Sequence, residues 1–198
     1  MYAKNTWEKY KDQLNEVFDY NEGYKHYISK NKTERACVKD SIKLAEEKGF
    51  KPLESFDTLK SGDKVYVTNR EKNIALFIIG KKPLTEGMRI LGAHIDSPRM
   101  DLKQNPLYES EGFTLADTHY YGGIKKYQWV TIPLSLYGVV CKKDGTVVDV
   151  VIGEDENDPV VGISDLLIHL SADQLDKKAA KVIEGENLDV TLGNMPLF

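Results

Sequence analysis

The residues with the clearest chemical potential are His94 and Asp96, which lie in the run His-Ile-Asp-Ser-Pro at residues 94–98. On an extended backbone, two residues spaced in this way project their side chains from the same face of the chain. This arrangement suits an imidazole that binds a metal, with a nearby carboxylate that orients the ring or raises its basicity. Pro98 disfavours helix for the residue before it, so the run ends abruptly. The run is therefore the first candidate for a metal or catalytic site.

The His-x-Asp spacing is a weak signal by itself, since a chain with four histidines meets it by chance fairly often. The alternative interpretation is a histidine at the end of a strand, hydrogen-bonded to a neighbouring turn. His26 lies between tyrosines and is interpreted as a helix-surface residue, and His119 has no second ligand at metal spacing. His169, in the run Leu-Leu-Ile-His-Leu, is typical of a structural histidine beside an apolar face.

Other common catalytic patterns find no support in the sequence. Cys37 and Cys141 form no CxxC pair, so a zinc ribbon and a disulfide framework are both excluded. No serine lies in a Gly-x-Ser-x-Gly context, and Gly122-Gly123 lacks the lysine of a phosphate-binding loop. Two isolated cysteines predict reduced thiols and a cytoplasmic protein.

Length and charge narrow the class of protein further. A chain of 198 residues predicts one large domain or two small ones. Its net charge of −4 gives no general attraction to nucleic acid or to an anionic membrane. No apolar run approaches the roughly 18 residues of a membrane span, and the first residues lack the apolar core of a signal peptide. We therefore expect neither a nucleic-acid partner nor a membrane partner.

Two helices are predicted before residue 50. Apolar residues recur at helical spacing over residues 7–18, and Gly23 is predicted to interrupt this helix. Asn31 with Glu34 resembles a capping box, which predicts the start of a second helix. Gly49 and the proline that follows it are expected to end that helix.

Buried strands are predicted next. Residues 74–79 and 88–93 are apolar without alternation, which is typical of strands covered on both faces, and the second run leads into His94. Helices followed by such strands favour an α/β fold, in which N-terminal helices pack on a mixed sheet. In open α/β sheets, ligand sites gather at the carboxyl ends of strands, which is where this reading places His94.

The character of the sequence changes after about residue 102. Glycines and prolines punctuate the chain, and residues 134–141 and 147–152 predict a hairpin with Asp144-Gly145 in its turn. Residues 164–170 are predicted to form a helix that could extend to residue 180. We therefore expect two domains, residues 1–102 and residues 103–198.

Three runs, taken in order, resemble a known family. Residues 91–99 (Leu-Gly-Ala-His-Ile-Asp-Ser-Pro-Arg), followed by Asp-Leu-Lys at residues 101–103, resemble the first metal motif of a zinc aminopeptidase family. This family includes the aspartyl aminopeptidases and vacuolar aminopeptidase I. The similarity continues at residues 118–124 (Thr-His-Tyr-Tyr-Gly-Gly-Ile) and 164–170 (Ser-Asp-Leu-Leu-Ile-His-Leu). Three ordered matches are far more specific than any single one.

The resemblance implies a role for each candidate residue. His94 would be a zinc ligand, and Asp96 would be the catalytic carboxylate that orients it. His169 would bind substrate, reaching the active site of a neighbouring subunit in a homo-oligomer. Two zinc ions would share a water that a glutamate deprotonates, and the substrate would be a peptide that loses its N-terminal amino acid. Residues 1–102 would belong to an α/β/α peptidase core, and residues 103–198 to a β-rich inserted dimerisation domain.

The sequence also departs from the family pattern. The family's other metal ligands and its general base follow the inserted domain, whereas Glu46-Glu47 precedes His94 and is in the wrong order to replace them. We therefore expect the chain to correspond to the N-terminal part of such an enzyme and to be inactive alone. The alternative is a non-catalytic truncated product or an oligomerisation module. Zinc, manganese and cobalt all suit the ligands, and substrate preference, acidic or neutral, stays open.

Overall fold

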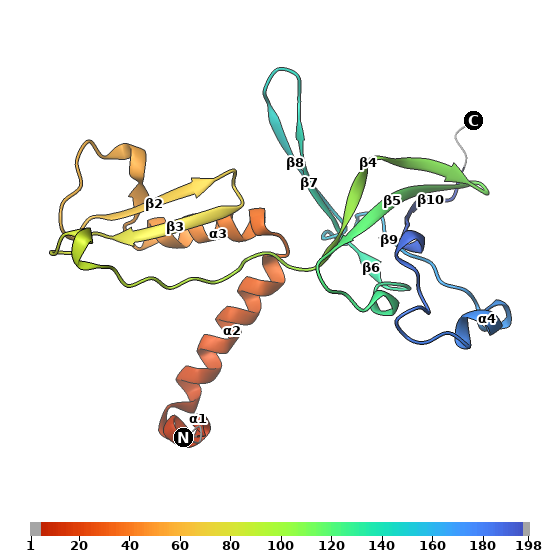
Figure 1. Ribbon diagram of the computed structural model, residues 1–198, viewed down its shortest axis with the longest axis horizontal. Coiled ribbons are helices and arrows are strands. Elements are labelled where there is room, and N and C mark those ends of the chain that lie inside the picture. The colour runs from red at the N-terminus through yellow and green to blue at the C-terminus, as the bar shows by residue number, and fades with distance from the viewer. Residues whose placement is uncertain (1–4, 196–198) are drawn as a thin grey trace. The chain divides into compact units, whose positions relative to one another are not determined.

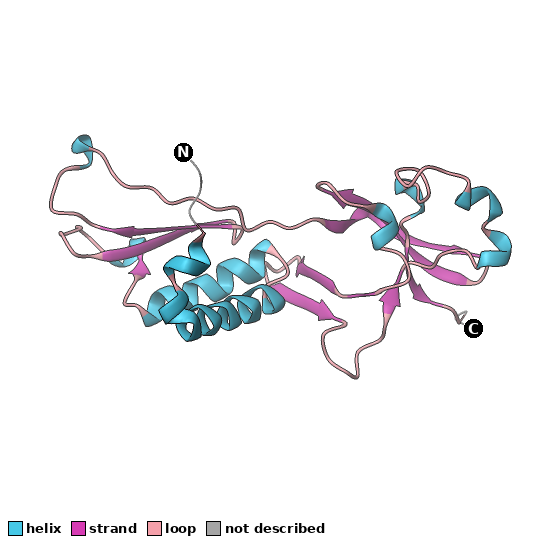
Figure 2. Ribbon diagram, turned by 90° about the horizontal axis from the view of Figure 1, so that it is seen from below, coloured by secondary structure: helices cyan, strands magenta, loops and turns pink. Residues whose placement is uncertain are grey.

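The computed structural model describes residues 5–195 and divides into two compact units, one ending at Ser97 and the other beginning at Pro98. Figure 1 labels the elements along the chain. The long helices belong to the first unit, and the second consists mainly of strands and loops (Figure 2). The predicted α/β class, with N-terminal helices and a mixed sheet, is confirmed. None of the described helices is long and apolar enough to cross a membrane.

The first helices differ from the prediction at Gly23. After the short α1 (Thr6–Lys9), α2 (Leu14–Lys30) runs through Gly23 without a break. A single glycine inside a helix costs only about 1 kcal/mol relative to alanine, which the surrounding helix-compatible residues outweigh. No residue of α2 is buried, and the helix extends away from the sheet of its unit in Figure 1.

The third helix, α3 (Glu34–Glu47), begins later than the proposed cap. Its N-cap is Thr33, whose side chain accepts a hydrogen bond from the backbone N–H of Ala36 at 3.3 Å. Asn31 instead ends α2 and donates its side-chain amide to Asp40 at 2.9 Å. The capping box predicted from Asn31 is therefore wrong, because threonine and asparagine both cap helices and Thr33 lies in the register that this helix uses.

The sheet of the first unit has three strands in the order β1-β2-β3. The strands β1 (Lys51–Pro52) and β2 (Lys64–Asn69) are parallel, and β3 (Asn73–Ile78) is antiparallel to β2. Helix α3 packs against β2 and β3, and the buried Tyr66 on β2 donates its hydroxyl to Glu46 on α3 at 2.9 Å. This contact fixes one side of the sheet to the helix.

Neither apolar run is buried as predicted. On β3, Leu76 is 47% exposed and Ile78 is 66% exposed. Residues 88–97 contain no helix or strand, and Ile90 and Leu91 are 78% and 101% exposed. An apolar run becomes a covered strand only when neighbouring elements pair with it. In the described part of the chain β3 is the edge of its sheet, so the prediction of strands covered on both faces is wrong.

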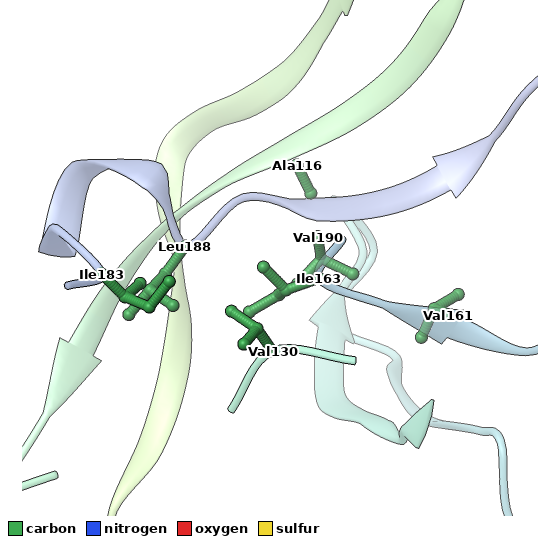
Figure 3. Packing of buried hydrophobic residues seen from close by; sticks show 7 residues of the cluster. All are labelled: Ala116, Val130, Val161, Ile163, Ile183, Leu188 and Val190. Atoms are coloured by element: carbon green, nitrogen blue, oxygen red, sulfur yellow. The ribbon is translucent and has the colours of Figure 1, made fainter. Parts of the chain in front are cut away.

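The second unit is built around an antiparallel sheet in the order β4-β5-β10-β9-β6. Its strands are β4 (Arg99–Ser110), β5 (Phe113–Tyr121), β6 (Pro133–Leu134), β9 (Val161–Gly162) and β10 (Val190–Gly193). Its core is a cluster of buried aliphatic side chains (Figure 3), namely Ala116, Val130, Val161, Ile163, Ile183, Leu188 and Val190. Glu111 and Gly112, both with positive φ, form the turn between β4 and β5.

The predicted hairpin is confirmed, but the predicted C-terminal helix is wrong. Strands β7 (Leu136–Cys141) and β8 (Val147–Ile152) pair antiparallel, and Gly145 takes the positive φ that the turn requires. The region predicted as helix contains a 3₁₀ turn at Ile168–Leu170 and the four-residue α4 (Ala172–Leu175). The leucines there lie exposed, and a short helix without an apolar surface to pack on is marginal.

The exposed apolar side chains of residues 76–78 and 88–91 lead us to expect self-association of the 198-residue chain. Exposed apolar surface of this kind favours association because burial removes it from water. Light scattering is expected to show species larger than a monomer, and Ile90→Lys with Leu91→Lys should shift them toward the monomer. Adding the same charges at the exposed Gln104 and Asn105 serves as the control. A monodisperse wild-type monomer would contradict the expectation.

A second prediction concerns Asp40, which joins α2 to α3. Hydrogen bonds from Lys30 at 2.6 Å and from Asn31 lower the pKa of its carboxyl group. A folded pKa below the unfolded value stabilises the fold above about pH 4, and this contribution is lost as pH falls through the folded pKa. Asp40→Asn is therefore expected to lower the unfolding free energy by about 1 kcal/mol at neutral pH.

The measurement is urea unfolding followed by the helical circular dichroism signal of the first unit. The difference between wild type and Asp40→Asn should shrink when the titration is repeated at about pH 3. An equal difference at both pH values would show that the carboxylate charge plays no part.

Candidate functional site

The predicted histidine lies at a cavity of the first unit. The cavity has a volume of about 320 Å³ and is lined by the first turn of α3, the start of β3 and the irregular segment around residue 95. Its lining residues are Glu34, Lys72, Asn73, Ala93, His94, Ile95 and Asp96. The structure therefore brings together His94 and Asp96 and adds a helix and a turn as the other walls.

The ring of His94 is held through its Nδ1 atom. Nδ1 lies 3.0 Å from the backbone carbonyl oxygen of Asp96 and 3.4 Å from its carboxylate oxygen Oδ1. A backbone carbonyl can only accept a hydrogen bond, so Nδ1 must carry the hydrogen. In the neutral ring, the lone pair then resides on Nε2. With its side chain 86% exposed, His94 presents a nitrogen suited to a metal.

Asp96 contributes both its backbone and its side chain. Its carboxylate is 45% exposed and lies within 3.4 Å of Nδ1, as the spacing suggested, but the shorter contact comes from its carbonyl. The carbonyl therefore determines which nitrogen is protonated, and the carboxylate adds negative charge beside the ring. A backbone contact of this kind cannot be predicted from residue types, because every residue has a backbone carbonyl.

An ion pair also lines the cavity. The carboxylate of Glu34, with its side chain only 13% exposed, pairs with Lys72 at 3.2 Å. Next to this pair, Arg35 pairs with Glu71 at 3.1 Å, so two contacts join the first turn of α3 to the β2–β3 turn. Sequence reasoning treated Glu34 as a helix cap and missed it as a cavity residue. Because its partner is distant in sequence, no local pattern could have indicated this role.

His169 belongs to the second unit. It lies exposed on the 3₁₀ turn Ile168–Leu170, rather than on the helix predicted for it. His119 lines a smaller cavity of that unit with Glu184 and Glu186, but these two carboxylates pair with Lys177 and Lys103 respectively. The His119 ring itself stacks on Tyr120, with ring centroids 5.6 Å apart. The expectation that His119 has no second metal ligand stays a prediction.

Within residues 5–195, no group of three or more histidine, cysteine or acidic side chains is placed to share one metal ion. A catalytic zinc is typically held by three protein ligands. His94 and Asp96 supply an imidazole nitrogen and a carboxylate, which are both zinc-type donors. The donor set thus fits one part of a zinc site.

An α/β unit that presents an open imidazole and a carboxylate at one cavity defines a candidate metalloprotein. Residues 27–195 match the family described as Aminopeptidase I zinc metalloprotease (M18). The chain belongs to this family of peptidases. The predicted resemblance is therefore confirmed.

Individual relatives support the assignment. A probable M18 family aminopeptidase 1 from Clostridium acetobutylicum is 58% identical over 199 residues, covering 98% of this chain and 43% of the relative. The crystal structure of an M18 aminopeptidase from Thermotoga maritima superimposes with a TM-score of 0.90 at 43% identity, covering 100% of this chain and 43% of that one. Yeast mApe1, solved as a dodecamer, shares the fold with a TM-score of 0.67 at 23% identity, over 88% of this chain and 38% of its own. The chain thus spans less than half the length of these relatives.

The hydrogen bond to the Asp96 carbonyl predicts an unusual tautomer for His94. Isolated neutral imidazoles favour a hydrogen on Nε2, whereas this contact requires it on Nδ1. Ring-¹⁵N-labelled histidine, observed by NMR at about pH 9, should show mainly the Nδ1–H form for His94. The exposed His26 serves as the control, and His94→Ala assigns the signal. Asp96→Ala should keep the tautomer because the acceptor is backbone; a majority of Nε2–H in wild type would contradict the geometry.

Proposed function

We propose that this chain supplies part of the active site of a zinc-dependent aminopeptidase, which releases N-terminal amino acids from peptides. Membership of the M18 family supports the reaction class. The observation that carries the proposal is the open Nε2 side of His94, at a cavity that also holds the Asp96 carboxylate.

In this proposal His94 is a zinc ligand and Asp96 is the residue that orients it. Bound zinc ions would polarise the scissile carbonyl and make a bound water more acidic. The Asp96 carbonyl keeps the hydrogen on Nδ1, and its carboxylate stabilises positive charge that develops on the ring. The proposed site has two metals. Its remaining ligands and its general base would come from the part of the relatives' length that this chain does not match. Manganese and cobalt would suit the same donors.

We also propose a substrate-binding role for His169 and homo-oligomeric assembly. His169 is exposed, so its imidazole is accessible to a peptide or to another subunit. The solved dodecamer of yeast mApe1, which shares the fold, supports assembly. In the proposed division, residues 1–102 belong to the peptidase core and residues 103–198 to an inserted dimerisation domain. The two compact units are consistent with a division of this kind.

A second candidate is a non-catalytic module that assembles with other copies through its β-rich part. One observation favours it: the described residues bring no three potential metal ligands together. Exposed valines on the β7–β8 hairpin, such as Val140 and Val151, would suit a contact surface. The two candidates differ in whether His94 matters for catalysis.

A chimera tests the proposed function. In the C. acetobutylicum relative, the matching 43% of the chain would be replaced by these 198 residues, which are 58% identical to it. The chimera is expected to cleave aminoacyl anilides in a zinc-dependent manner. His94→Ala should reduce this activity more than about 100-fold, since losing even the residues around metal ligands costs about 10- to 100-fold.

Two controls accompany the chimera. His26→Ala changes an exposed histidine on α2 and is expected to leave activity unchanged. The 198-residue chain alone, with excess zinc, should show no turnover because residues 5–195 bring too few ligands together. Full activity of the His94→Ala chimera would refute the ligand role, and turnover by the isolated chain that His94→Ala abolishes would show that every ligand lies within it.

A further inference from the structure

The segment that carries His94 has no regular structure of its own. Residues 88–97 form neither helix nor strand, so no hydrogen-bonded ladder holds them. The contacts of His94 with Asp96 lie within three residues and fix the ring relative to its own segment. They do not fix the segment relative to the fold. A metal ligand needs both, because ligand geometry must be held within a fraction of an ångström.

A buried thiol on α3 makes a contact that joins this segment to the fold. The side chain of Cys37 is 6% exposed, and its Sγ lies 3.8 Å from the carbonyl oxygen of Ile95 and 3.6 Å from that of Asn31. Both acceptors are carbonyls, so the thiol hydrogen is the donor for each and is shared between them. Ile95 lies between His94 and Asp96, and its carbonyl belongs to the peptide plane that leads into Asp96.

We infer that Cys37 is a positioning residue for His94. The thiol holds the Ile95 carbonyl, this orients the following peptide and the Asp96 carbonyl, and the Asp96 carbonyl holds the hydrogen on Nδ1 of His94. The lone pair of Nε2 is thereby aimed and kept available. The inference deepens the proposed function and rests on it for the purpose of this arrangement.

The helix that carries Cys37 is itself well anchored. Thr33 caps its first turn, and Glu34, which lines the same cavity, joins that turn to Lys72. Asp40 accepts hydrogen bonds from the end of α2, and Val38 is 1% exposed. A hydrogen-bond donor on a helix fixed in this way holds its acceptor at a defined position. A donor on a loop would move with the loop.

Simple packing is the alternative explanation for a buried cysteine, since the residue is often a small apolar filler. Both of the chain's cysteines are free thiols, so no disulfide accounts for the burial of Cys37. Packing alone predicts that a change at Cys37 alters stability without changing the protonated nitrogen of His94. The tautomer therefore separates the two explanations.

The experiment uses the 198-residue chain with ring-¹⁵N-labelled histidine and Cys141→Ser, which removes the exposed thiol as a zinc ligand. Without metal, Cys37→Ala is expected to convert the His94 tautomer from mainly Nδ1–H to mainly Nε2–H. Cys37→Ser should restore Nδ1–H because a hydroxyl also donates. Zinc is then added, and its affinity is read from the change in the His94 signal. Cys37→Ala should weaken this affinity about 10-fold, and Cys37→Ser much less.

Val38→Ala is the matched control on the same helix. It removes buried volume and should lower thermal stability at least as much as Cys37→Ala, while the His94 tautomer stays as in wild type. A tautomer that Cys37→Ala leaves unchanged, or that Val38→Ala shifts equally, overturns the inference. A wild-type His94 signal that ignores zinc overturns the proposed ligand role instead, and the metal-free tautomer still decides the role of Cys37.

Discussion

The proposed chemistry of this chain depends on one hydrogen bond, from Nδ1 of His94 to the backbone carbonyl of Asp96. It decides which ring nitrogen keeps a lone pair, and so which nitrogen is left to bind a metal in the proposed site. The Asp96 carboxylate lies near enough to tune the ring but is not the closest contact. Because the bond is local, its usefulness depends on what holds the segment in place, and α3 with its buried thiol lies against that segment.

A second constraint is that apolar side chains are buried to different extents in the two units. In the second unit, aliphatic side chains from several strands close into a core in which Ala116 and Leu188 are fully buried. In the first unit, comparable side chains on β3 and at Leu91 remain exposed. Burial requires partner elements, and the chain spans 43% of the length of its M18 relatives. In the proposed enzyme, the same additional elements would cover these apolar side chains and supply the other metal ligands.

Local signals predicted some elements well and others poorly. The β7–β8 hairpin follows directly from Asp144-Gly145 between two apolar runs, because the turn needs a positive φ that glycine allows. The β4–β5 hairpin was missed, although Glu111-Gly112 forms an equally tight turn, since its strands lack a clear alternation. The helix expected after residue 164 failed because its leucines have nothing to pack against. Residue types thus predicted the β7–β8 turn but not which apolar residues are buried.

By itself the sequence determined the family, the α/β class and the proposed metal residue His94. An ordered set of short motifs can be recognised from residue types alone, without information on contacts. Only the tertiary structure decided that the Asp96 carbonyl holds the ring, that Glu34 faces the cavity with Lys72, and that Cys37 reaches Ile95. The last two contacts join residues far apart in the chain, and the first involves backbone atoms that every residue shares. Their geometry therefore arises from the folded path of the chain and not from residue identity.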